Sequence, residues 1–149
     1  MTEIRSAGPA DLDCVVTIEQ ASFAPASGGF SRRQLRRLLG NPRARWRLIE
    51  CLAVACWLRT TNGRQSWARL YSLAVLPRAR GQGLAAKLLE DGFRWMAAHG
   101  LVRCFAEVSV ANEGALRLYR RHGFSERALL PDYYGPGQDG VSLIKTVSA

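Results

Sequence analysis

A glycine-rich turn between a predicted strand and a predicted helix is the segment of this sequence best suited to bind an anion. The strand ends in the apolar run Leu73–Val75, the turn Arg80–Gly83 follows, and apolar residues return at helical spacing from Leu84. The first amides of a helix have no intrahelical partners, and glycines let a phosphate approach the backbone closely. We therefore expect phosphate binding here, with a turn that only bends the chain as the alternative.

Two common nucleotide-binding motifs are absent from the same turn. The dinucleotide fingerprint G-x-G-x-x-G would need a glycine where the chain has Ala86. The loop G-x-x-x-x-G-K-[ST] does not occur either. The sequence therefore does not indicate a dinucleotide-binding domain or a P-loop ATPase.

Hydrophobic periodicity and turn residues predict the elements that must hold this turn. Helices are predicted over residues 12–22, 32–39, 84–99 and 112–121, the second beginning with the capping box Ser31-x-x-Gln34. Strands are predicted over residues 46–50, 52–60, 67–75, 102–109, 124–128 and 141–147, after an extended start at 4–7. Asn62-Gly63 predicts a hairpin, and residues 24–30 form a loop of small residues. The order βααβββαβαββ predicts one mixed α/β domain over residues 1–149.

The positive charge of the chain is concentrated in one segment. The formal net charge is +9, and seven arginines without an acid lie between Ser31 and Arg47, so this segment carries +7 and the rest +2. An Arg32–Arg47 patch is compatible with RNA or ribosome binding, with an acidic peptide, or with a solvated surface. Arg33 and Arg37, one turn apart on the second predicted helix, are candidate contacts for such a partner.

The cysteines and apolar runs indicate a reduced protein without membrane spans. The four cysteines (Cys14, Cys51, Cys56 and Cys104) form no CxxC pair, and the two histidines complete no zinc-ligand spacing. Three of the four cysteines lie in apolar runs, so we expect buried, reduced thiols and no metal site. No run reaches the roughly 18–20 apolar residues of a membrane span, and no signal pattern begins the chain. We expect a cytoplasmic protein.

Two blocks of sequence resemble the GNAT N-acetyltransferase superfamily. The run Arg80-x-x-Gly83-x-Ala85, with the apolar strand before it, resembles the acetyl-CoA motif. The block Phe105–Phe124 and the tyrosine segment at 131–135 are similar to the branch that acetylates ribosomal-protein alanine. The resemblance implies a single GNAT-like domain with a central, mostly antiparallel, twisted sheet of about six to seven strands and about four helices.

The resemblance also implies an acetyl-CoA-dependent N-acetyltransferase, acting on the N-terminal α-amine of a protein or peptide. The implied cofactor-binding residues are Leu73, Ala74, Val75, Arg80, Gly81, Gln82, Gly83, Leu84, Ala85, Ala86 and Asn112. The candidate acceptor-binding residues are Phe30, Arg33, Arg37, Tyr133 and Tyr134. A lysine side chain or a small amine is the alternative acceptor, and an RNA- or ribosome-binding module is the alternative of another class. Both a monomer and a homodimer fit the sequence.

Glu107 and Tyr119 match the positions of the general base and general acid of that branch. An amine attacks only after losing its proton, which a strand carboxylate can accept, and a phenol can protonate the thiolate of CoA. Glu107 is the only acid on its predicted strand. Apart from the resemblance, Glu107 fits an ion-paired surface carboxylate, Tyr119 a core residue and Asn112 a simple helix cap.

Overall fold

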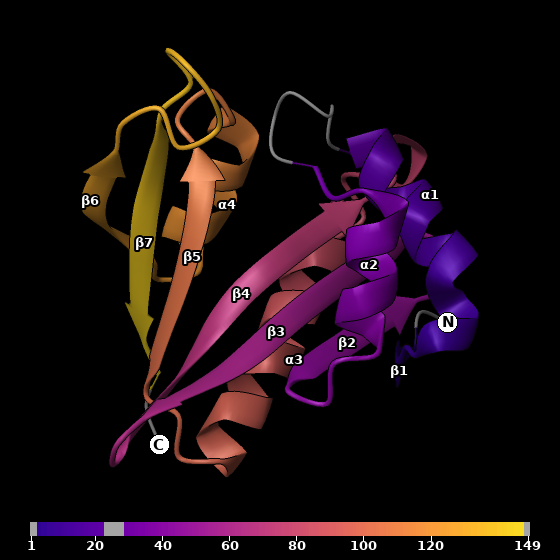
Figure 1. Ribbon diagram of the computed structural model, residues 1–149, viewed down its shortest axis with the longest axis horizontal. Coiled ribbons are helices and arrows are strands. Elements are labelled where there is room, and N and C mark those ends of the chain that lie inside the picture. Colours follow the sequence, from indigo (N-terminus) through magenta and orange to yellow (C-terminus); the bar gives the residue numbers. More distant parts are fainter. Residues whose placement is uncertain (1–2, 23–28, 148–149) are drawn as a thin grey trace.

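The computed structural model describes residues 3–22 and 29–147, which form a seven-stranded sheet with helices on both faces (Figure 1). The helices are α1 (Leu12–Ser22), α2 (Arg32–Leu39), α3 (Leu84–Ala98) and α4 (Glu113–Arg121). The strands are β1 (Ile4–Ser6), β2 (Ala44–Ile49), β3 (Ala53–Asn62), β4 (Gln65–Val75), β5 (Arg103–Ser109), β6 (Ser125–Leu130) and β7 (Gly140–Thr146). The predicted fold class is confirmed. Residues 24–28 of the predicted loop lie outside the described residues.

The sheet divides into two parts where β4 and β5 separate. The strand order is β1-β2-β3-β4-β5-β7-β6, and β4–β5 is the parallel pair in an otherwise antiparallel sheet. The parallel pairing joins Ala68–Leu70 to Cys104–Ala106. Beyond these residues β4 continues beside β3 and β5 beside β7, so the two strands diverge toward their C-terminal ends (Figure 1).

A β-bulge at Tyr71 changes the face of the sheet on which the residues of β4 lie. Leu70 pairs with Trp57 and Ser72 pairs with Cys56, so Tyr71 has no partner in the register with β3. The side chains of two directly opposed residues lie on the same face of the sheet. The Trp57 side chain packs against α3, so its partner Leu70 lies on the α3 face. The Ser72 side chain hydrogen-bonds to α1, on the opposite face. The bulge thus places Leu70 and Ser72 on opposite faces, whereas a regular strand puts residues two apart on one face.

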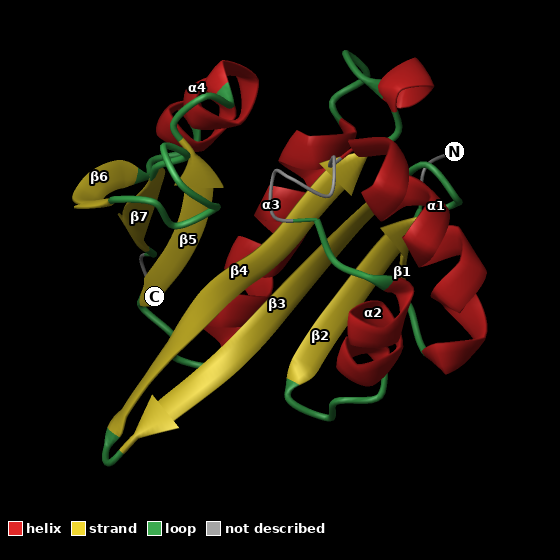
Figure 2. Cartoon of the chain, turned by 45° about the horizontal axis from the view of Figure 1, so that its top comes forward, coloured by secondary structure: helices red, strands yellow, loops and turns green. Residues whose placement is uncertain are grey.

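Different helices cover the two faces of the sheet (Figure 2). α1 and α2 pack on β2, β3 and β4 on one face, and α3 packs on β3 and β4 on the other. Trp57, fully buried, lies so close to α3 that a Cβ built on Gly92 would be 2.0 Å from its Cζ2 atom. The glycine in the middle of this helix therefore allows the helix to approach the sheet. Among the described helices, none combines the length and apolar character needed to cross a membrane.

The predicted boundaries lie within two residues of the observed ones. α1 and α2 have the predicted bounds, and the capping box is confirmed, because the Ser31 hydroxyl accepts a hydrogen bond from the Gln34 amide and the Gln34 side chain accepts one from the Ser31 amide. The β3–β4 hairpin turns at Gly63-Arg64, one residue later than predicted. Gly63 has a φ of +64°, a conformation that favours glycine in such a turn.

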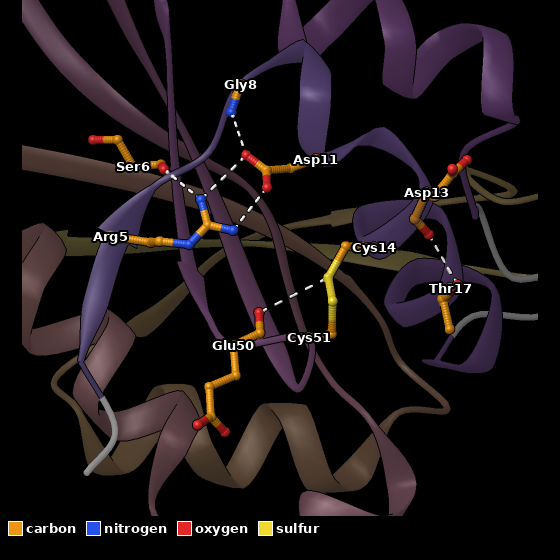
Figure 3. The surroundings of a disulfide bond; sticks show 9 residues. All are labelled: Arg5, Ser6, Gly8, Asp11, Asp13, Cys14, Thr17, Glu50 and Cys51. Carbon is orange, nitrogen blue, oxygen red and sulfur yellow. Dashed lines mark hydrogen bonds and ion pairs between the residues drawn. A yellow bond between two sulfur atoms is a disulfide. The ribbon is translucent and has the colours of Figure 1, made fainter.

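A disulfide joins Cys14 on α1 to Cys51 in the turn between β2 and β3 (Figure 3). The prediction that all four cysteines are buried and reduced is therefore wrong for this pair. Their Cα atoms are 5.5 Å apart although 37 positions separate them in sequence, so the packing of α1 beside this turn brings them together. Cys56 and Cys104 are free and buried, as predicted.

Replacing Gly92 with alanine tests the close approach of α3 to the sheet. Alanine favours a helix by about 1 kcal/mol over glycine, but here its methyl group would collide with Trp57. We expect Gly92→Ala to lower the free energy of unfolding by about 1–3 kcal/mol, measured by urea denaturation. Gly114→Ala in α4 is the matched control, because the nearest atom to its Cβ is 3.9 Å away, and we expect no loss of stability there. Equal effects of the two substitutions would contradict the packing explanation.

Reducing the Cys14–Cys51 disulfide should destabilise the protein, because the bond restricts a loop of 37 residues in the unfolded chain. A loop of this size corresponds to about 4 kcal/mol, measured as the difference in unfolding free energy with and without a reductant. Cys51→Ser should have the stability of the reduced protein and no response to reductant. Alkylation in denaturant before reduction should modify Cys56 and Cys104 alone, and modification of all four cysteines would refute the bond.

Candidate functional site

A cavity of about 890 Å³ opens where β4 and β5 separate. It is lined by residues of these strands, the turn before α3, the helix α4 and the segment after β6. Among the described residues, the charged ones in its lining are Arg69, Arg80, Glu107, Arg117 and Arg121. Four cations against one acid favour an anionic ligand.

One part of the cavity is formed by the glycine-rich turn before α3. Gly81 and Gly83 have φ values of +79° and +77°, and a Cβ on either would meet no atom within 4 Å. Gly83 is the N-cap of α3, and no described side chain caps the helix, so its first amides are available to a ligand. Arg80 and Ala85 line the cavity beside the turn. This arrangement of open backbone, free amides and positive charge suits a phosphate.

The cavity continues along β4 toward the point where the strands meet. Leu73, Ala74 and Val75 line it, and the ladder between β4 and β5 has already ended at Leu70. An extended ligand can therefore hydrogen-bond to this edge of β4 in the manner of an added strand.

Glu107 lies where the strands begin to separate, one residue beyond the last paired residue of β5. Its side chain is 19% exposed, and its Oε1 atom lies 2.6 Å from Nη2 of Arg69. Arg69 belongs to β4 and lines the same cavity. The carboxylate is thus held by a cation from the neighbouring strand while it remains open to the cavity.

Tyr119 reaches the same cavity from α4. Burial raises the pKa of its phenol above the ordinary value, so the hydroxyl stays protonated at neutral pH. Its ring packs against Phe124 with centroids 5.3 Å apart. Asn112 caps α4 by accepting a hydrogen bond from the Ala115 amide and also lines the cavity. Helix capping and proximity to the ligand site therefore coexist in Asn112.

Four aromatic residues, Phe30, Tyr71, Tyr133 and Tyr134, form what we call the aromatic wall of the cavity. Phe30 stacks on Tyr71 with centroids 5.2 Å apart and an interplanar angle of 12°. Tyr133 and Tyr134 meet edge to face at 4.9 Å. Burial, together with neighbouring ionisable groups, raises the pKa of Tyr134 to about 12. The wall therefore offers flat apolar surface and hydroxyl groups.

A second carboxyl group lies behind the cavity wall. Glu19 on α1 is 1% exposed and accepts a hydrogen bond of 2.5 Å from the hydroxyl of Ser72, which lines the cavity. Burial raises the pKa of Glu19 to about 7, although the bond from Ser72 acts in the opposite direction. Its Oε2 atom is buried without a hydrogen-bond partner among the described residues. Glu19 therefore titrates near neutral pH inside the core.

The cavity brings together most of the residues expected in the site. Lining residues that were expected are Phe30, Leu73, Ala74, Val75, Arg80, Gly81, Ala85, Glu107, Asn112, Tyr119, Tyr133 and Tyr134. The expected residues outside the lining are Gln82, Gly83, Leu84 and Ala86, in or next to the turn, and Arg33 and Arg37, exposed on α2. Sequence reasoning missed Arg69, Ser72 and Glu19. The one available signal was that Arg69 is the single charged residue between positions 67 and 75.

The arginines between positions 32 and 47 do not form one continuous free surface. Arg45 and Arg47 contact Asp91 on α3 at 2.9 and 3.1 Å. Burial of Asp91 acts against its charge, but hydrogen bonds from the two arginines hold its pKa below the ordinary value. Arg32 pairs with Asp13 at 2.5 Å on the other face of the sheet. The remaining arginines of the segment, Arg33, Arg36, Arg37 and Arg43, are exposed.

Sequence comparison relates residues 35–124 to a known family. These residues match the acetyltransferase (GNAT) family and include the glycine-rich turn, Glu107 and Tyr119. The chain is 28% identical over 151 residues to the putative [ribosomal protein bS18]-alanine N-acetyltransferase of Bacillus subtilis, over 97% of this chain and 95% of that protein. It is 35% identical over 88 residues to an uncharacterized N-acetyltransferase of Methanocaldococcus jannaschii. That match spans 56% of this chain and 55% of the relative, so the chain covers about half the relative's length.

Structural comparison gives the same fold. The crystal structure of the ribosomal-protein-S18-alanine N-acetyltransferase from Escherichia coli superposes with a TM-score of 0.83. The superposition covers 100% of this chain and 96% of that protein at 24% sequence identity. The likeness concerns the arrangement of strands and helices.

Glu19 should make stability depend on pH in a definite direction. Its pKa in the folded protein is about 7 against an ordinary 4.5, so the folded state binds more protons between these values. The contribution of Glu19 to the free energy of unfolding is fully present below pH 4.5 and is lost as the pH rises through about 7. We expect Glu19→Gln to abolish this decrease in the free energy of unfolding, which amounts to up to about 3 kcal/mol in the wild type.

Urea denaturation of the wild type and Glu19→Gln at about pH 5 and about pH 8 measures the effect. Glu90→Gln, at an exposed position of α3, is the control and should keep the wild-type pH dependence. The same pH dependence in wild type and Glu19→Gln would show that Glu19 does not titrate in this interval.

Proposed function

Because this chain belongs to the acetyltransferase (GNAT) family, we propose that it is an acetyl-CoA-dependent N-acetyltransferase whose acceptor is the α-amine of a protein or peptide. The observation that carries the proposal is the continuous cavity between β4 and β5. It links an uncapped glycine-rich helix start to a carboxylate and a buried phenol. Different groups along one cleft are therefore available to bind the cofactor, to remove a proton and to donate one.

The residues of the cleft fit acetyl-CoA. The amides at the start of α3 and the Arg80 side chain suit the pyrophosphate, and open space at Gly81 and Gly83 lets it approach the backbone. The edge of β4 at Leu73–Val75 suits the pantetheine arm, which is extended and carries amide groups. When bound, acetyl-CoA supplies an acetyl group already activated as a thioester.

In this proposal Glu107 is the general base. The acceptor amine must lose a proton before its nitrogen can attack, and Glu107 can take the proton directly or through a water molecule. The ion pair with Arg69 keeps the carboxylate in one position at the narrow end of the cleft. The amine then attacks the acetyl carbonyl directly. The two free cysteines are buried and take no part in this chemistry.

Tyr119 is the proposed general acid. Its phenol is protonated at neutral pH, because burial raises its pKa. The hydroxyl donates its proton to the sulfur that leaves when the carbonyl re-forms. Glu107 on β5 and Tyr119 on α4 thus act on different atoms, one on the amine and one on the leaving group.

The acceptor class rests on the relatives and on the aromatic wall. The B. subtilis protein is named as a putative alanine N-acetyltransferase of ribosomal protein bS18, and it is matched over nearly its whole length. The aromatic wall beside Glu107 offers flat surfaces to the first residues of a peptide. A lysine side chain or a small amine is the competing acceptor.

Peptide substrates can separate these acceptors. We expect acetylation of peptides with a free N-terminus and no lysine, and no acetylation after the N-terminus is blocked, with mass spectrometry locating the acetyl group. Equal rates on blocked lysine peptides would exclude α-amine selectivity. Absence of acetyl-CoA binding by calorimetry at about millimolar concentration would reject the acetyltransferase proposal as a whole.

Substitution of the two catalytic candidates tests their roles. Glu107→Gln and Tyr119→Phe keep the side-chain shape but remove the base and the acid, so each should lower kcat by about 100-fold or more. The dissociation constant of acetyl-CoA, measured by calorimetry, should change by less than about threefold. Glu90→Gln is the control for the loss of one carboxylate and should retain wild-type kcat. Wild-type turnover in either catalytic variant would remove that residue from the mechanism.

A further inference from the structure

Arg69 occupies a central position among the residues around Glu107. Besides its contact with Glu107, its guanidinium carbon lies 5.1 Å from the centre of the Tyr71 ring. Its Nη2 atom also donates a hydrogen bond of 3.4 Å to the Tyr133 hydroxyl. A single side chain therefore connects the carboxylate to two members of the aromatic wall.

These contacts continue beyond Arg69. Tyr71 stacks on Phe30, which precedes α2 in the chain, and Tyr71 itself is the bulge residue of β4. The contacts Phe30–Tyr71, Tyr71–Arg69 and Arg69–Glu107 form one series from the segment before α2 to the carboxylate on β5. The aromatic wall and Glu107 are therefore joined by a series of direct contacts.

We propose that Arg69 is a positioning residue, which fixes the Glu107 carboxylate against the aromatic wall and so couples acceptor contacts on the wall to proton removal. The inference rests on the proposed role of Glu107 as general base. Arg69 cannot itself accept the proton, because a guanidinium stays charged in proteins. Its contribution is the place and orientation of the carboxylate.

The chemistry of the guanidinium suits this role better than a simple charge would. Its planar fork can lie over a ring and donate to two groups at once, whereas a lysine ammonium is a compact point charge. Tyr134 and Cys104 are ionisable groups that also interact with Glu107. Burial raises the pKa of each to about 12, so both are neutral at neutral pH. Arg69 is thus the charged group that holds Glu107 in the described part of the site.

Steady-state kinetics of Arg69→Met and Arg69→Lys tests the proposal. We expect Arg69→Met to lower kcat by about 10- to 100-fold, with the KM for acetyl-CoA changed by less than about twofold. Arg69→Lys should recover only part of the loss, because it restores the charge without the planar fork. Arg103→Met, which removes an arginine bonded to Gln65 away from the cavity, is the matched control and should behave as wild type.

A double-mutant cycle separates positioning from a general structural effect. If Arg69 acts through Glu107, Arg69→Met should change kcat by less than about twofold in the Glu107→Gln background. An equally large loss in both backgrounds, or full activity of Arg69→Met, would overturn the proposal. Thermal unfolding and acetyl-CoA calorimetry check that each variant is folded. If Arg69→Met does not fold, Arg69→Lys decides, because wild-type kcat in that variant would count against positioning.

Different outcomes would reject the proposed function and the positioning role of Arg69. A wild-type protein that neither binds acetyl-CoA nor transfers acetyl groups removes the proposed function. If the wild type is active and Glu107→Gln lowers kcat strongly, but Arg69→Met keeps the wild-type kcat, only the positioning role is rejected.

Discussion

The separation of β4 from β5 is the constraint on which the rest of the site depends. The two parallel strands are joined over three residue pairs, and each then continues with its antiparallel neighbour on the outer side. The resulting gap leaves one edge of β4 open and lies beside the start of α3, the helix α4 and the tyrosine segment after β6. A continuous sheet would have satisfied these backbone groups internally. The cleft therefore originates in strand pairing and not in the size of particular side chains.

Two carboxyl groups contact side chains of β4 in different electrostatic surroundings. Glu107 is paired with Arg69, whereas Glu19 is buried behind Ser72, and burial raises its pKa to about 7. Arg69 and Ser72 are three residues apart and would lie on opposite faces of a regular strand. The bulge between them places both on the face covered by α1 and α2. Residues of β4 thus contact an ion-paired carboxylate at the cleft and a titrating carboxyl in the core.

Features set by neighbours along the chain could be predicted, and features set by contacts between distant elements could not. The capping box at Ser31, the Asn112 cap and the glycine-rich turn depend on residues within a few positions, and the structure contains all three. The placement of Glu107 and Tyr119 in one cavity followed from a resemblance in motif spacing. The Cys14–Cys51 bond and the Ser72–Glu19 contact join residues 37 and 53 positions apart, and periodicity carries no information on such pairs. The bulge is equally hidden, because one extra residue leaves the apolar pattern of a strand nearly unchanged.

The extra residue in β4 also limits how this chain can change during evolution. Replacing a side chain near the bulge alters the cleft locally, because the backbone register on either side is kept. Removing or adding one residue between Leu70 and Ser72 would instead turn one half of the strand over, sending Arg69 toward α3 or Ser72 away from α1. A change in length at the hairpin turn at Gly63 does not shift the register in this way, because β3 ends and β4 begins there. Substitutions along β4 are therefore compatible with the arrangement of the cleft, whereas an insertion or deletion inside the strand is not.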